Sequence, residues 1–226
     1  MGSVLQSAWQ TANVVTMITR DTFDQTDWSM FDVVCFAIKP QDFKLLTSLP
    51  LPAQLIISIM AGISTEAVMA KTGSTKVIRC MPNTPMQIKH GMSAWCATTE
   101  VPADVKAWFT TSLQSVTQLL EVPNDDWINK ATAVSASGPG FVFAILEQYI
   151  QATQQLGFSP EQAVQLASQT LIGSAKLLEQ SNQTASELKQ AVTSKGGTTA
   201  AGLDVLQVNW SAVLQAAYQR AQELSQ

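Results

Sequence analysis

The feature that most constrains the fold is a change of pattern near the middle of the chain. The first half carries five short, largely uninterrupted apolar runs, at residues 14–18, 33–38, 55–60, 77–81 and 92–97. Helix-like segments separate them. Runs of this kind are typical of strands in a parallel sheet that helices cover on both faces. The first half is therefore predicted to be a doubly wound α/β layer.

The second half has a different period. From about Asn124 onward, long segments rich in Ala, Leu, Gln and Glu carry apolar residues at helical spacing. We expect a long helix over residues 141–156, stopped by Gly157, and then a helix to about residue 180 with Ser159 as its cap and Pro160 in its first position. A short helix over residues 186–192, a Gly-rich turn over residues 194–199 and further helix to about residue 223 complete this half.

These patterns predict two domains, residues 1–123 and 124–226. The connection between them is short, so we expect the two to pack together. The chain is 46% hydrophobic and only 13% charged. Such a composition indicates large buried faces, either within one monomer or at a subunit interface.

Composition also excludes several classes of partner. The apolar runs are far shorter than the roughly 20 residues that cross a bilayer, and residues 1–10 lack the pattern of a secretory signal. We therefore expect a cytoplasmic protein without a membrane partner. The net charge is −4 and no basic run occurs, which argues against nucleic acid. Three unpaired cysteines and one histidine indicate a reducing compartment and no metal site.

Candidate ligand-binding residues follow three of the predicted strands. Parallel strands deliver such residues to the carboxyl edge of a sheet. Lys39 and Pro40 follow one run, Ala61 and Gly62 the next, and Asn83 stands between two prolines after a third. Each feature also has a plain structural interpretation, as a solvated lysine, an ordinary turn or a stiff loop.

The most distinctive motif lies in the second half, over residues 192–203. Two adjacent glycines, Gly196 and Gly197, stand between hydroxyl residues just before a predicted helix. Backbone N–H groups in such a turn suit the capture of a carboxylate. Residues 135–140 form a second Gly-rich helix start, for which a binding role and an architectural role are equally open.

Taken in order, these elements resemble the pyrroline-5-carboxylate reductase family across nearly the full length. The resemblance rests on residues 39–41, 58–62, 79–85 with Gly91, 135–139, 156–157 and 193–202. It implies an amino-terminal Rossmann-like domain and an all-α carboxy-terminal dimerisation domain, with substrate held where they meet. It also implies a homodimer or higher homo-oligomer that reduces 1-pyrroline-5-carboxylate to L-proline with NADPH, or with NADH as the alternative donor.

The resemblance also assigns roles to single residues. It places the substrate on Ser194, Gly196, Gly197, Thr198 and Thr199, with Thr199 as the catalytic hydrogen-bond donor near the imine. It places the cofactor on Gly2, Ser3, Arg20, Ala37, Lys39, Pro40, Ala61 and Asn83. Arg20 would meet the 2′-phosphate of NADPH, while Asp21 beside it leaves NADH open. The lone His90 is expected to be a loop residue without a catalytic role.

The chain departs from the family pattern in three places. Met1, Gly2 and Ser3 resemble the end of a Gly-x-Gly-x-x-Gly motif, or alternatively an expression scar, so we expect an incomplete Rossmann-like domain without the strand and glycines that open that motif. The absence of that first strand would leave the neighbouring strands with unpaired backbone groups. Lys195 stands where the family usually has proline, and Asn182 where it often has an acid.

Two other hypotheses remain beside the enzyme. A truncated, catalytically silent homologue that only dimerises is favoured by the missing glycines and disfavoured by the intact turn over residues 193–202. A related imine or β-hydroxyacid reductase should carry a catalytic lysine on the long interdomain helix. Residues 141–156 contain no lysine, so this hypothesis ranks last.

Overall fold

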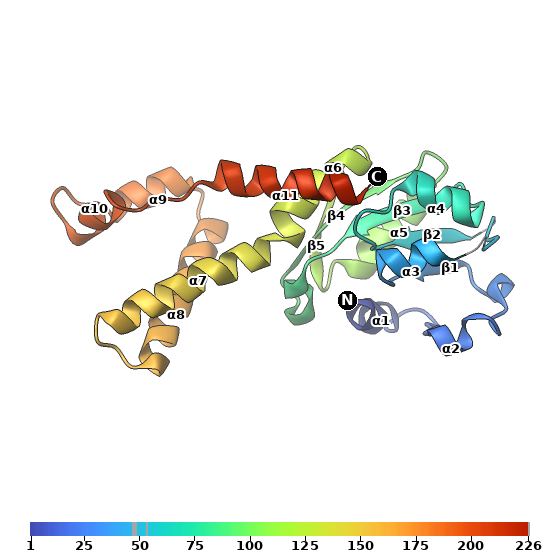
Figure 1. The fold of residues 1–226 in the computed structure, drawn as a ribbon, viewed down its shortest axis with the longest axis horizontal. Helices are drawn as coiled ribbons and strands as arrows, with labels where there is room; N and C mark the ends of the chain where they lie inside the picture. Colours follow the sequence, from blue (N-terminus) through green and yellow to red (C-terminus); the bar gives the residue numbers. More distant parts are fainter. Residues whose placement is uncertain (47–48, 53, 226) are drawn as a thin grey trace. The chain divides into compact units, whose positions relative to one another are not determined.

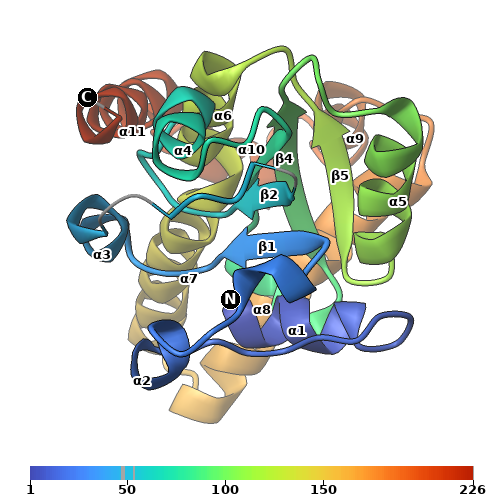
Figure 2. The same ribbon diagram turned by 90° about the vertical axis from the view of Figure 1, so that its right-hand side faces the viewer.

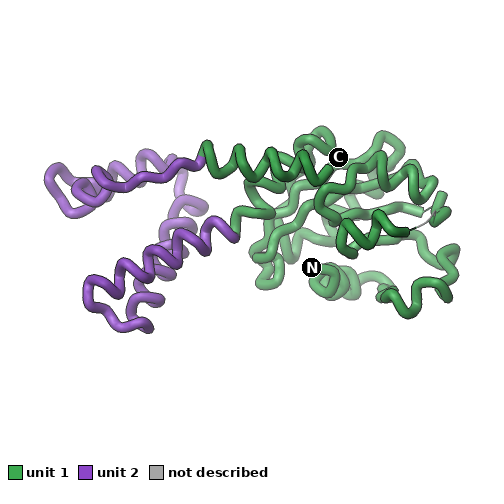
Figure 3. The backbone as a smooth tube through the Cα atoms, in the orientation of Figure 1, with its two compact units in different colours: residues 1–139, 211–226 green, residues 140–210 purple. Residues whose placement is uncertain are grey.

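The chain forms two compact units, of which the computed structural model describes residues 1–46, 49–52 and 54–225. Unit 1 comprises Met1–Pro139 and Ser211–Gln226, and unit 2 comprises Gly140–Trp210 (Figure 3). The domain boundary predicted between residues 123 and 124 lies before this division and stays a prediction.

Unit 1 is built on a five-stranded sheet in the order β1-β2-β3-β4-β5 (Figure 1). The strands are β1 (Val33–Phe36), β2 (Leu55–Ser58), β3 (Val77–Met81), β4 (Gly91–Ala97) and β5 (Thr117–Glu121). The strands β1, β2 and β3 run parallel, as do β4 and β5, whereas β4 runs antiparallel to β3. The Rossmann-like α/β class is confirmed. The expectation of a wholly parallel sheet is wrong at β4, because the short loop over residues 82–90 has no room for the crossover that parallel strands need.

Two errors in the strand predictions have the same physical origin. Residues 14–18 form no strand and have no ladder partner, and Val14 is fully exposed while Val15 packs on the core. An extended segment becomes a strand only beside a neighbour, and no other strand of the described part of the chain lies next to this one. The missed strand β5 is an edge strand whose polar residues Gln118 and Glu121 break its apolar run.

Helices cover both faces of the sheet (Figure 2). One face carries α1 (Gly2–Trp9) and α5 (Ala103–Leu113), which bury Trp9 and Phe109 in one apolar cluster. The other face carries α3 (Pro40–Leu45) and α4 (Thr65–Thr72), which bury Phe43 and Val68 in a second cluster. This arrangement is the doubly wound layer expected from the apolar runs.

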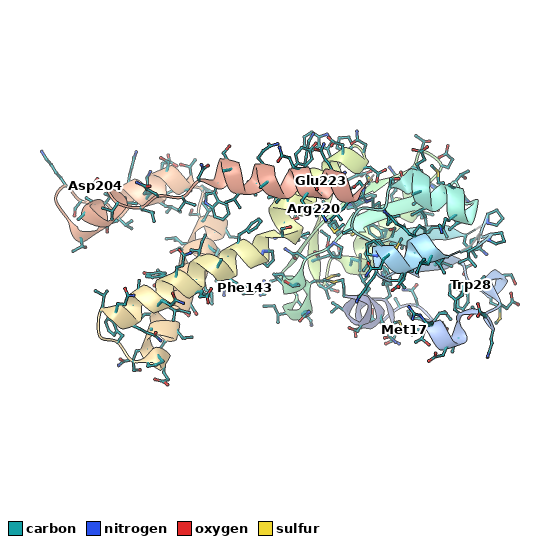
Figure 4. All side chains as sticks on the ribbon, viewed as in Figure 1. Met17, Trp28, Phe143, Asp204, Arg220 and Glu223 are labelled. Carbon is teal, nitrogen blue, oxygen red and sulfur yellow. The ribbon has the colours of Figure 1, made fainter. Side chains whose placement is uncertain are left out.

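Two short elements precede β1, namely α2 (Arg20–Phe23) and η1 (Trp28–Met30). Trp28 packs edge-on against Phe23 with ring centroids 5.1 Å apart, and Met17 lies on the extended segment before them (Figure 4). These aromatic contacts fix the chain between α1 and the sheet.

The remaining elements of unit 1 gather beside the β3 and β4 strands. They are η2 (Thr84–Ile88), α6 (Asp125–Ala131), the π-helical turn η3 (Thr132–Ala136) and the later part of α11 (Trp210–Leu224). A third apolar cluster joins Met81 and Ala94 of the sheet to Ile128 of α6. The carboxy-terminal segment thus belongs to the same unit as the sheet.

Unit 2 is all helical, as expected. It contains most of α7 (Gly138–Gln155), then α8 (Pro160–Gln180), α9 (Ala185–Ala191) and α10 (Thr198–Leu203). The predicted start of α8 is confirmed, since the Ser159 side chain accepts a hydrogen bond from the N–H of Gln162 and Pro160 is the first helical residue. Gly157, at a φ of +100°, ends the turn after α7.

Candidate cofactor and substrate sites

The carboxyl edge of the three parallel strands collects most of the residues that were expected to bind a cofactor. Ala37 and Lys39 follow β1, Ala61 follows β2 and Asn83 follows β3. Since the neighbouring strands pair in register, for example Phe36 with Ser58 and Ser58 with Arg79, their carboxyl ends meet at one edge. Open sheets of this class bind ligands outside such an edge.

The beginning of α1 lies beside this edge. A Cβ atom on Gly2 would lie 3.3 Å from the Cβ of Ala37, so the helix start and the end of β1 are in close contact. Val4 and Leu5 donate to the Met1 carbonyl, at 3.0 and 3.2 Å, and no side chain caps the helix. The N–H groups of Gly2 and Ser3 precede these bonds and point out of the helix start, where an anion is stabilised.

Two cations stand near the start of α3. Lys39 is the N-cap residue of α3 with an exposed side chain, and Pro40 occupies the first turn. Arg20, which is 86% exposed, donates from Nη2 to Oδ1 of Asp42 at 3.4 Å and so ties α2 to α3. Lys39 therefore has no ion-pair partner among the residues that the structure describes, whereas Arg20 shares its charge with a carboxylate.

Asn83 is held by the protein on both sides of its amide. Its Nδ2 donates to the carbonyl of Ser135 at 3.0 Å, and its Oδ1 accepts from the N–H of Met92 at 2.8 Å. The residue is 9% exposed. One hydrogen of Nδ2 and one lone pair of Oδ1 remain, so the amide fixes the loop after β3, and its predicted contact with a cofactor stays a prediction.

The five residues expected to bind substrate come together in one turn of unit 2. The Gly197 N–H donates to the Ser194 carbonyl at 3.0 Å, and Gly196 has a φ of +72°. Lys89 is the one non-glycine residue with a positive φ among those the structure describes, so Lys195 has a negative φ. This is the pattern of a type II turn, in which proline is common at the position that Lys195 occupies.

The turn leads straight into α10. A Cβ atom on Gly197 would lie 2.4 Å from Oγ of Ser194 and 3.2 Å from its carbonyl oxygen, so a larger residue here would displace the Ser194 hydroxyl. No side chain caps α10. The N–H groups of its first three residues also have no acceptor within the helix, because they precede its first intrahelical hydrogen bond. Ser194, Thr198 and Thr199 are exposed. Backbone donors and exposed hydroxyl groups thus occur together in one turn and helix start, which suits a carboxylate.

The cysteines and the histidine add no nucleophile or general base. Burial raises the pKa of the Cys35 thiol to about 12, and it also raises the pKa of Cys80. For Cys96 the pKa is about 12, mainly through burial and then through the nearby charge of Asp125. His90 is an exposed loop residue.

Two further properties concern the part of the chain that the structure describes. No group of three or more acidic, histidine or cysteine side chains within it is placed to hold a metal ion. No helix among those residues is both long and apolar enough to cross a membrane.

Sequence reasoning missed a buried polar network next to the carboxyl edge. Arg79 of β3 is completely buried, donates to Oδ1 of Asp125 at 2.6 Å and donates to Oδ1 of Asn129 at 3.0 Å. The signal was an arginine inside an apolar run, which requires a buried acceptor. Its partner on α6 was not identifiable, because the contact joins residues far apart in the chain.

Comparisons with known proteins identify one family. The family model described as "Pyrroline-5-carboxylate reductase dimerisation" matches residues 125–226. The chain is 36% identical over 205 residues to a pyrroline-5-carboxylate reductase of Pseudomonas aeruginosa, and the alignment covers 86% of this chain and 75% of the relative.

Two solved structures of the same name are also similar. One, from Coxiella burnetii, has a TM-score of 0.79 at 33% identity and covers 86% of this chain and 76% of its own. The other, from Plasmodium falciparum with NADP bound, has a TM-score of 0.86 at 26% identity and covers 100% of this chain and 94% of its own.

Proposed function

This chain belongs to the pyrroline-5-carboxylate reductase family, and we propose that it reduces the imine of 1-pyrroline-5-carboxylate to L-proline with NADPH. The observation that carries the proposal is the turn over residues 194–199, whose open N–H groups and exposed hydroxyl groups suit a carboxylate next to a polar ring atom. It supports an enzyme of proline biosynthesis, and a cytoplasmic location stays a prediction.

The carboxyl edge of β1–β3 supports NADPH as the hydride donor. The start of α1 at Gly2 and Ser3 would receive the pyrophosphate, and Lys39 would contribute its charge nearby. Pro40, Ala37 and Ala61 would line the cofactor with little bulk. Arg20 would meet the 2′-phosphate only by releasing Asp42, which keeps NADH as the alternative donor.

When it is bound, NADPH supplies a hydride to the imine carbon, the C=N π electrons pass to the protonated nitrogen, and NADP⁺ and a secondary amine result. The role of the protein is to hold the acceptor. In our proposal, Ser194 and the N–H groups of Gly196 and Thr198 bind the carboxylate, and the N–H of Gly197 closes the turn on the Ser194 carbonyl. The Thr199 hydroxyl donates a hydrogen bond to the ring nitrogen. Such positioning accounts for most of the rate in a reaction that needs no strong base.

A homo-oligomer formed through unit 2 is part of the proposal. Large apolar side chains on its helices are exposed, among them Phe143 on α7, which projects from the helix in Figure 4. Monomeric proteins rarely expose apolar surface on this scale. A second copy of the chain is the partner that buries it, in agreement with the dimerisation family that matches residues 125–226.

The second candidate is a catalytically silent homologue that dimerises without using a cofactor. One observation favours it: residues 14–18 have no strand beside them and β1 pairs only with β2 among the described strands. On this view, the residues after β1 that would hold NADPH belong to a strand with a pairing partner on one side only. Activity and binding measurements separate the two candidates.

The direct test compares two substitutions at Thr199. Thr199→Ala removes the hydroxyl and should lower kcat roughly 10²-fold with little change in Tm, whereas Thr199→Ser keeps the hydroxyl and should stay within a few fold of the parent chain. Activity is measured as NADPH oxidation with 1-pyrroline-5-carboxylate. Equal kcat values for the parent chain and Thr199→Ala would remove Thr199 from the mechanism, and an inactive parent chain would favour the silent homologue.

A further inference from the structure

The loop that follows β2 lies directly against the last turn of α11. A Cβ atom on Gly62 would stand 2.4 Å from the carbonyl oxygen of Leu224, 2.8 Å from its carbonyl carbon and 2.9 Å from its Cβ. Gly62 also has a φ of +70°. Glycine is required here twice, by its backbone conformation and by the approach of the helix backbone.

The last turns of α11 are anchored on α6. Ala221 is buried, Oγ of Ser225 donates to Oδ1 of Asn129 at 3.1 Å, and the hydroxyl of Tyr218 donates to Oδ1 of Asp126 at 2.6 Å. Both views of the ribbon show this end of α11 beside α6 (Figures 1 and 2). The contact with Gly62 is therefore fixed by three separate interactions.

The same helix, α6, also holds the far end of the loop. Asp125 accepts from the N–H of Thr65 at 3.2 Å and from the Thr65 hydroxyl at 2.6 Å, and it pairs with the buried Arg79. Thr65 is the first residue of α4, just after the loop. Ala61 directly precedes Gly62 and packs on the cluster around Met81.

We infer that the last turn of α11 positions the loop over residues 59–64 for the cofactor, which makes Gly62 and Leu224 positioning residues. The inference rests on the proposed function, because the loop matters for binding only if Ala61 lines NADPH. The carboxy-terminal helix then influences cofactor affinity through the loop. If Asp125 alone held the loop, a change in α11 would leave the affinity for NADPH unchanged.

The chain offers a matched control for this inference. Gly73 also has a φ of +70°, but a Cβ atom there would meet nothing within 4 Å. Gly62→Ala and Gly73→Ala therefore both place a side chain at a φ of +70°, and only the first brings it against α11. We expect Gly62→Ala to raise the Kd of NADPH roughly tenfold and Gly73→Ala to leave it within about twofold. The KM of the imine substrate should be unchanged in both.

A second comparison removes the contact from the other side. In a chain that ends at Glu223, NADPH should bind roughly tenfold more weakly, and adding Gly62→Ala should then change the Kd by less than about twofold. The same tenfold effect of Gly62→Ala in both backgrounds, or equal Kd values for Gly62→Ala and Gly73→Ala in the full chain, would overturn the inference.

Amide hydrogen exchange separates this inference from the proposed function. If the full chain fails to bind NADPH, the proposed function is wrong. Exchange over residues 59–65 still reports whether α11 fixes the loop. Faster exchange in Gly62→Ala than in Gly73→Ala supports the inference, and equal exchange contradicts it.

Discussion

The two units bury their side chains to very different degrees. Unit 1 encloses large residues such as Phe43, and it even buries Arg79 completely. In unit 2, Thr153, Ala163 and Ala167 are the residues less than a tenth exposed among those described, and all three are small. Unit 1 therefore has its own core, whereas unit 2 has helices without one.

What unit 2 leaves uncovered is mostly apolar. Its large hydrophobic residues with more than a third of their surface exposed are Val142, Phe143, Ile145, Tyr149, Leu156, Phe158, Val164, Leu166, Leu171, Ile172, Leu177, Leu178, Val192, Val205, Leu206, Val208 and Trp210. These side chains lie on α7, on α8, at the start of α11 and in the segments that connect the helices, and so many of them cannot all be buried by rearranging these helices alone. The comparison teaches that unit 2 gains its stability from a second copy of the chain.

The largest expected effect comes from placing a charge on the apolar surface of unit 2. Leu177 in unit 2 and Leu120 in unit 1 are 54% and 51% exposed, so Leu177→Glu and Leu120→Glu are matched. Leu177→Glu should convert the dimer to a monomer and lower Tm, because it buries an unpaired charge at the interface. Leu120→Glu should do neither. Analytical ultracentrifugation measures the first outcome and calorimetry the second.

The same variants test whether unit 1 stands alone. Cys80 and Cys96 lie in unit 1 and are buried, and burial raises the pKa of both thiols, so these two should react with iodoacetamide only after unfolding. They should remain protected in monomeric Leu177→Glu. Rapid labelling of that monomer would show that unit 1 also depends on the dimer.

The next effect concerns an ion pair in the core of unit 1. Arg79→Met leaves Asp125 beside a buried apolar group and should lower the free energy of unfolding by about 3–5 kcal/mol. Arg220→Met breaks a pair of similar length with Glu223 on the exposed side of α11 (Figure 4), and should cost less than about 0.5 kcal/mol. Urea denaturation measures both. Similar losses of unfolding free energy in the two variants would mean that burial does not make the Arg79 pair more important for stability than the exposed Arg220 pair.

The smallest effect is expected in the turn of unit 2. Lys195 occupies the position of a type II turn at which proline is favoured, and Gly196 supplies the positive φ that follows. Lys195→Pro should raise stability by about 0.4–1 kcal/mol, because it restricts the unfolded chain. Thermal unfolding of the dimer measures the change. A loss of stability would show that the Lys195 backbone or side chain is needed in the turn.

Local signals in the sequence predicted the parts of the structure that depend on near neighbours. The cap at Ser159 with Pro160, and the four buried apolar runs that became β1 to β4, needed no knowledge of distant contacts. The α/β class of unit 1 and the all-helical class of unit 2 likewise followed from the local spacing of apolar residues. The residues of the substrate turn were also predicted together, because they are contiguous.

Features that depend on distant partners were not predictable. Residues 14–18 carry a strand-like run but have no strand to pair with, and the missed β5 becomes a strand through its pairing with β4. The acceptor of Arg79 on α6 and the approach of Leu224 to Gly62 join segments far apart in the chain. Tertiary contacts, rather than local propensity, decided these cases.

The measurement that tests the central claim most directly is calorimetric titration of the purified chain with NADPH, beside Lys39→Ala and Lys44→Ala. Both lysines have exposed side chains on or next to α3, but only Lys39 stands at the carboxyl edge of β1. We predict binding with a Kd on the order of micromolar, weakened roughly tenfold by Lys39→Ala and unchanged by Lys44→Ala. An absence of binding heat and of NADPH oxidation in the parent chain would contradict the account and leave dimerisation as its function.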